Sequence, residues 1–150
     1  MRQLPVIPLI PTTARPDAPG HPAVRALPAA GAIEIPPGVT LLHLAPEMPG
    51  GPGDTEAQSR VALGGIAGRL AQLGLGLGDL VRLQVALAPD PGRAGTADRA
   101  GFEAAWHETL GNQSPIRPLL CILQVTGLGA PDRLVAIEAT AARPTPQAGH

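Results

Sequence analysis

His43 and Glu47 are two side chains whose types and spacing suit acid–base chemistry. They lie in the segment VTLLHLAPEM, with Ala45 midway between them. Alternate side chains of a strand point to the same face, so these three residues share a face if the strand continues through Pro46. An imidazole and a carboxylate on one face could exchange protons with a bound molecule. The alternative interpretation places His43 on a partly exposed sheet surface and Glu47 in a solvated loop.

Arg117 is a candidate for binding a carboxylate. It is flanked by prolines in SPIRPLLCILQV and stands directly before an apolar run. A guanidinium offers parallel N–H groups that match the two oxygens of a carboxylate. The other interpretation is that Arg117 only marks a bend or the rim of a site.

Cys121 and Glu138 lie within later apolar runs. The chain contains no lysine, and no histidine lies near Cys121 in the sequence to stabilise a thiolate. We therefore interpret Cys121 as a small core residue. Glu138, in LVAIEA, alternates with apolar neighbours and points either into a cleft or out of the sheet.

Composition excludes several classes of function. The net charge of −1 and the presence of one Phe, one Trp and no Tyr argue against a nucleic-acid surface. The four histidines and single cysteine show no metal-ligand spacing, and we expect no metal or other cofactor. GLGLGD follows a predicted helix and precedes a strand, which is the reverse of a dinucleotide-binding loop. No apolar run approaches the roughly 18 residues of a membrane span, so a soluble, cytoplasmic protein that binds a small molecule is expected.

The elements that must position these residues follow the order β-β-α-β-α-β-β. We expect residues 1–30 to be a proline-rich extension, 31–143 to form one domain and 144–150 to be a tail. Asp54 or Thr55 could cap the first helix and Thr96 the second. The core face of the first helix is predicted to hold Ala57, Val61, Leu63, Ile66, Leu70 and Leu73. The segment LGDLVRLQVALA is predicted to be a strand whose side chains alternate strictly between two faces. One face would hold Leu80, Arg82, Gln84 and Ala86, and the other Val81, Leu83, Val85 and Leu87.

Three segments together resemble the YjgF/RidA family of reactive-intermediate (imine) deaminases. They are GDTEAQSRVALGGIAGRLAQLGLGLGDLVRLQVAL, GFEAAWHETLG and PLLCILQVTGLGAPDRLVAIEATAAR, within about residues 38–143. The resemblance implies an α+β, chorismate-mutase-like fold, in which a mixed sheet carries two helices on one face. It also implies a homotrimer with small-molecule clefts between subunits.

The family's substrate-binding arginine is not matched in this sequence. The family pattern is Arg-Pro-Ala-Arg before the penultimate strand, and its second arginine binds the substrate carboxylate. Counting back from the last strand without a gap places Pro118 on the proline, Leu119 on the alanine and Leu120 on that second arginine. Arg117 then matches the arginine before the proline. Shifting it onto the binding position would insert three residues into a strand and reverse the face of every side chain.

Other family positions also differ. The last strand of the family reads Val-Glu-Ile-Glu, whereas here Ala136 replaces the first glutamate and Glu138 keeps the second. The Ser-Gly-Gln of the family corresponds to Ala45, Pro46 and Glu47. An early family tyrosine has no counterpart, because the chain contains no tyrosine.

Three hypotheses follow from this resemblance. The first is a repurposed trimeric enzyme of specialised metabolism that cyclises, isomerises or hydrolyses an imine- or carbonyl-bearing molecule. Its inter-subunit cleft would be lined by Leu120, Ile122, Ala136 and Ala45, with Glu138 nearby and with His43 and Glu47 as polar groups. The second is a non-catalytic protein that binds a ligand or a partner. The third is an ordinary 2-imino acid deaminase that uses Arg117.

Overall fold

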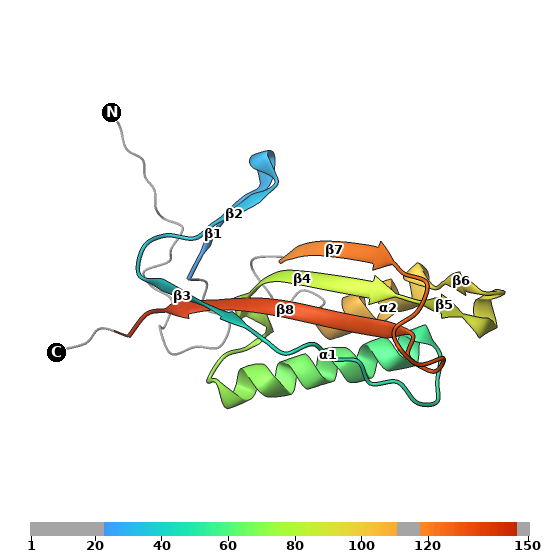
Figure 1. The fold of residues 1–150 in the computed structure, drawn as a ribbon. Helices are drawn as coiled ribbons and strands as arrows, with labels where there is room; N and C mark the ends of the chain where they lie inside the picture. The colour runs from blue at the N-terminus through green and yellow to red at the C-terminus, as the bar shows by residue number, and fades with distance from the viewer. Residues whose placement is uncertain (1–22, 111–117, 147–150) are drawn as a thin grey trace.

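The computed structural model describes residues 23–110 and 118–146. A four-stranded mixed sheet, ordered β3-β8-β4-β7, carries the helices α1 and α2 on one face (Figure 1). This arrangement confirms the expected α+β class. The helices are α1 (Thr55–Gln72) and α2 (Arg99–Leu110). The strands are β1 (Arg25–Leu27), β2 (Ala32–Glu34), β3 (Val39–His43), β4 (Leu80–Leu87), β5 (Pro89–Asp90), β6 (Thr96–Ala97), β7 (Leu119–Gln124) and β8 (Val135–Pro144).

Helix α1 begins at the predicted cap but buries a different stripe. The Asp54 carboxylate accepts a hydrogen bond of 2.9 Å from the Ala57 N–H, which satisfies a free donor of the first turn. Val61, predicted in the core, is 61% exposed, and Leu73 is 40% exposed. The buried stripe instead follows helical spacing through polar and apolar residues alike, namely Thr55, Gln58, Ser59, Ala62, Leu63, Ile66 and Leu70.

Helix α2 is capped by Asp98, and the predicted cap at Thr96 is wrong. The Asp98 carboxylate accepts a hydrogen bond from the Gly101 N–H at 3.0 Å. Thr96 lies in β6, and its hydroxyl donates to the Arg93 carbonyl at 2.8 Å. Both residue types are suited to capping a helix, and Asp98, which lies closer to the helix, provides the cap.

Strand β4 is central and carries a bulge at its start. It runs antiparallel to β8 and parallel to β7, and its register with β8 shifts between Leu80 and Arg82. Leu80 therefore lies in the helix-side core with Leu83, which breaks the predicted alternation, while Val81 joins a separate cluster. Beyond the bulge the alternation holds. The face away from the helices is called here the open face, and it carries His43, Arg82, Gln84, Ala86, Leu119, Cys121, Leu123, Ala136, Glu138 and Thr140.

The hairpin of β1 and β2 stands at one end of the open face. It rises from the side of the sheet opposite α1 (Figure 1). Ile33 of this hairpin packs on a small buried cluster formed by Val24, Val81 and Ala142. The hairpin crosses the boundary that the sequence placed after residue 30. In the described ranges, neither helix is long and apolar enough to cross a membrane.

Two buried polar side chains attach loops to the start of α1. Gln58 binds the loop before α1 and the loop before β8. Asp90 accepts hydrogen bonds from the N–H and hydroxyl of Thr55 and from the Gly92 N–H. Burial by itself raises the pKa of Asp90, but these three bonds and the charge of Arg93 outweigh it, and the pKa lies below its ordinary value. Asp90 is therefore ionised at neutral pH.

Candidate functional site

Four side chains form a row straight across the open face. His43 of β3 pairs with Thr140 of β8, Thr140 pairs with Arg82 of β4, and Arg82 pairs with Leu119 of β7. The side chains of directly paired residues lie on the same face of a sheet. The fold thus brings together an imidazole, a hydroxyl, a guanidinium and a leucine from four separate segments.

This row forms the floor of a shallow pocket with a volume of about 330 Å³. Glu138 lines it from the next open-face position of β8, and the β1–β2 hairpin contributes an isoleucine, Ile33, followed by Ile35 just beyond β2. The complete lining comprises Ile33, Ile35, Leu41, His43, Leu44, Val81, Arg82, Leu119, Glu138, Ala139 and Thr140.

The polar side chains of the pocket form few hydrogen bonds with other side chains. Nδ1 of His43 lies 3.0 Å from the Thr140 hydroxyl oxygen, so the imidazole is held by one ring nitrogen. Arg82 donates a single bond of 3.3 Å to the Gln84 side-chain oxygen. Within the described residues, Glu138 has no hydrogen-bond or ion-pair partner. A cation, an anchored imidazole and a carboxylate are therefore available to a ligand.

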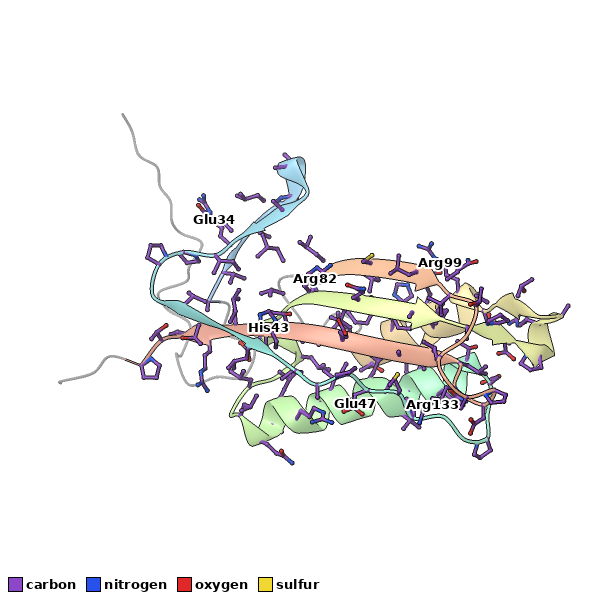
Figure 2. The ribbon with its side chains drawn as sticks, viewed as in Figure 1. Glu34, His43, Glu47, Arg82, Arg99 and Arg133 are labelled. Carbon is purple, nitrogen blue, oxygen red and sulfur yellow. The ribbon has the colours of Figure 1, made fainter. Side chains whose placement is uncertain are left out.

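Glu47 does not lie beside His43. Its backbone N–H and carbonyl both bond to Ile137, at 2.9 and 3.0 Å. Its carboxylate pairs with Arg69 of α1 and packs where Gly65 leaves room for it. Figure 2 shows His43 and Arg82 on the side of the sheet away from α1, whereas Glu47 lies beside α1. The strand ends at His43, so the period-two argument does not extend to Glu47.

The other predicted lining residues are spread over both faces. Leu120 and Ile122 pair with Leu83 and Val85, so they lie on the helix-facing side of β7. Ala136 is on the open face, paired with Ala86, but outside the pocket, as is exposed Ala45. Glu138 does line the pocket. Arg117 lies outside the described residues.

Sequence reasoning missed Arg82, Thr140 and Leu119. A charged residue within the apolar strand LVRLQVAL was a usable signal for Arg82. Nothing local distinguished Thr140, because its role depends on pairing with β3. Counting back through the loop between β7 and β8 selected Leu120 for the cleft lining, whereas its neighbour Leu119 lines the pocket.

No group of three or more His, Cys, Asp or Glu side chains in residues 23–110 and 118–146 is arranged to hold a metal ion. Cys121 lies on the open face, half-buried and paired with Gln84. The chemistry that the pocket itself offers is thus ionic recognition and proton transfer.

These features define a small α+β domain with a pocket on the uncovered face of its sheet. The chain belongs to the YjgF/YER057c/UK114 family, which confirms the resemblance seen in the sequence and the fold that it implies. A solved member of that family from Mycobacterium tuberculosis is 32% identical, with a TM-score of 0.55 over 76% of this chain and 88% of that chain.

Two more distant structures share the fold. TdcF of Escherichia coli, solved with bound serine, is 22% identical, with a TM-score of 0.57 over 69% of this chain and 81% of its own. The Rid protein YyfB of Yersinia pestis, described as of unknown function, is 23% identical, with a TM-score of 0.60 over 73% and 83%. No sequence model of a known family matches this chain, and no curated protein sequence does.

Proposed function

We propose that this chain is a homotrimeric enzyme that acts on a small carboxylate bearing a carbonyl or imine group. The single observation that carries the proposal is the row of His43, Thr140 and Arg82, with Glu138 beside it, on one pocket floor. Arg82 supplies a cation to the pocket, in place of the substrate-binding arginine that the sequence pattern matched to Leu120. The first hypothesis is thereby kept, with a polar floor in place of an apolar one.

Arg82 and His43 have separate roles in the proposed reaction. Arg82 binds the ligand carboxylate through charge-assisted hydrogen bonds. His43, held at Nδ1 by Thr140, presents Nε2 for proton transfer. In hydrolysis of an imine, water adds to carbon while the imidazole accepts one of its protons, and the imidazolium returns that proton to the nitrogen. The second proton then moves from the carbinolamine hydroxyl to the nitrogen by the same route. The C–N bond breaks, and ammonia leaves as the carbonyl forms. Isomerisation or cyclisation needs the same proton transfers without the water.

Replacing Arg82 by glutamine tests the ligand class. Pyruvate is a stable analogue of the small imino acid 2-iminopropionate, and calorimetric titration measures its Kd. Losing a hydrogen-bonded charge is expected to raise that Kd by about 10- to 100-fold. Arg99→Gln is the matched control, because Arg99 lies on α2 and pairs with Glu103 (Figure 2). Equal affinity of pyruvate for both variants would overturn the proposal.

The trimer is supported by exposed leucines on the open face. Leu41, Leu119 and Leu123 are 41%, 42% and 43% exposed, and a partner subunit packed on this face would remove their apolar surface from water. Leu123→Glu is expected to convert a trimer to monomers, because a buried carboxylate without a partner is costly. Light scattering after size-exclusion chromatography measures the mass. Val61→Glu, on the outer side of α1, should leave the trimer intact, and a native monomer would contradict the assembly.

A further inference from the structure

The pocket is divided into a polar end and an apolar end. Moving along the strands toward the β1–β2 hairpin, His43 is followed on its own face by Leu41, and Arg82 is followed by Val81. Ile33 and Ile35 face these two residues from the hairpin side. Moving the other way, β8 presents Glu138. A ligand whose carboxylate lies on Arg82 therefore has an apolar wall on one side of it.

The distance between the two ends fits a short carbon chain. Two residues of a strand span about 7 Å, which separates the His43 row from Leu41. A chain of about five carbons beyond a carboxylate, as in 2-oxohexanoate, covers nearly the same distance in extended form. A methyl group, as in pyruvate, would leave most of the apolar wall without contact.

The apolar wall is anchored by the fold. Ile33 packs on the buried cluster of Val24, Val81 and Ala142, so the hairpin is held against the sheet. Ile35 lies at the rim with 38% exposure and has no part in that cluster. The wall is thus fixed in place, while its rim residue is open to substitution without loss of the core.

We propose that this wall selects 2-oxo or 2-imino acids with a large apolar side chain over small ones such as pyruvate. The inference rests on the proposed function and adds the specificity of the same pocket. Ile35 and Leu41 are the specificity-determining residues. Burying the side chain against them removes apolar surface from water, and each added methylene strengthens binding.

A series of linear 2-oxo acids tests this selection. Calorimetric titration of the full chain with pyruvate, 2-oxobutyrate, 2-oxopentanoate and 2-oxohexanoate gives four Kd values. A fully buried methylene is expected to lower Kd about fourfold, so the last acid, with three more methylenes, should bind about 60-fold more tightly than pyruvate. Pyruvate bound as tightly as 2-oxohexanoate overturns the selection and leaves the proposed function standing. Failure of all four acids to bind overturns both.

Substitution of the rim assigns the selection to the hairpin. Ile35→Ser is expected to reduce the ratio of the pyruvate and 2-oxohexanoate Kd values severalfold, and Leu41→Ser provides a second position, on β3. Val61→Ser removes an equally apolar, exposed side chain from α1 and should keep the native ratio. An undiminished ratio in both pocket variants overturns the role of the wall.

Discussion

Replacing Gln58 by leucine is expected to lower the free energy of unfolding by at least about 3 kcal/mol, although leucine is apolar and similar in size. Gln58 is 1% exposed. Its amide nitrogen donates to the carbonyls of Gly51 at 3.1 Å and Asp132 at 2.8 Å. Its amide oxygen accepts from the Leu134 N–H at 2.9 Å. One side chain thus satisfies a buried backbone N–H, that of Leu134, and two part-buried carbonyls from separate loops.

The size of this effect comes from the groups left behind. A buried donor such as the Leu134 N–H costs about 1–3 kcal/mol when it loses its partner, and each part-buried carbonyl that loses a hydrogen bond adds about 0.5–1.5 kcal/mol. Urea denaturation followed by circular dichroism measures the change. Gln72→Leu is the matched control, because Gln72 lies exposed in the last turn of the same helix and should change stability by less than about 0.5 kcal/mol. Similar small changes in both variants would contradict the role of Gln58.

Gln58 also connects stability to the site. Leu134, whose N–H it binds, directly precedes β8, and β8 carries both Thr140 and Glu138. Loosening that loop would let the start of β8 move relative to α1. The open-face row depends on β8 keeping its register with β3 and β4, so the variant should lose ligand affinity with its stability.

The main elements of the fold could be predicted because their signals are local. The cap at Asp54, the end of α1 just before GLGLGD and the apolar alternation from Leu83 to Leu87 each belong to one segment. The errors arose where packing decides. The bulge at Val81 is invisible in an alternating pattern, and Val61 is apolar yet exposed because the buried stripe of α1 also accepts polar side chains such as Gln58.

The site could be predicted only in part because it is assembled by strand pairing. His43 and Glu138 were recognised from their residue types. Arg82 became meaningful only once β8 placed Thr140 between it and His43. Whether Leu119 or Leu120 faces the pocket depends on the count of residues through the loop after β7, because a shift of one residue changes the face. Counting along a sequence cannot fix such a register, whereas the pairing of Leu119 with Arg82 does.

Replacing His43 by glutamine is expected to have the largest effect on activity. If the imidazole transfers the proton in the reaction, kcat should fall by about 10²- to 10⁴-fold, while binding of a carboxylate to Arg82 persists. Glutamine keeps a polar group near Thr140, so the substitution removes the titrating base with little change in volume. Turnover of 2-iminopropionate, generated in the assay by an amino-acid oxidase, is measured as release of ammonia above the buffer rate.

Glu47→Gln is the matched comparison, because the sequence alone paired Glu47 with His43. The carboxylate of Glu47 lies against Arg69 and Gly65 of α1, on the other side of the sheet from the pocket. Losing such an ion pair changes stability by at most about 1 kcal/mol and should leave kcat within about twofold of the native value. Equal losses in the two variants would contradict the separation that the fold imposes. Native turnover retained in His43→Gln would remove His43 from the mechanism. Ligand binding with no turnover by the native protein would instead assign the pocket to binding without catalysis.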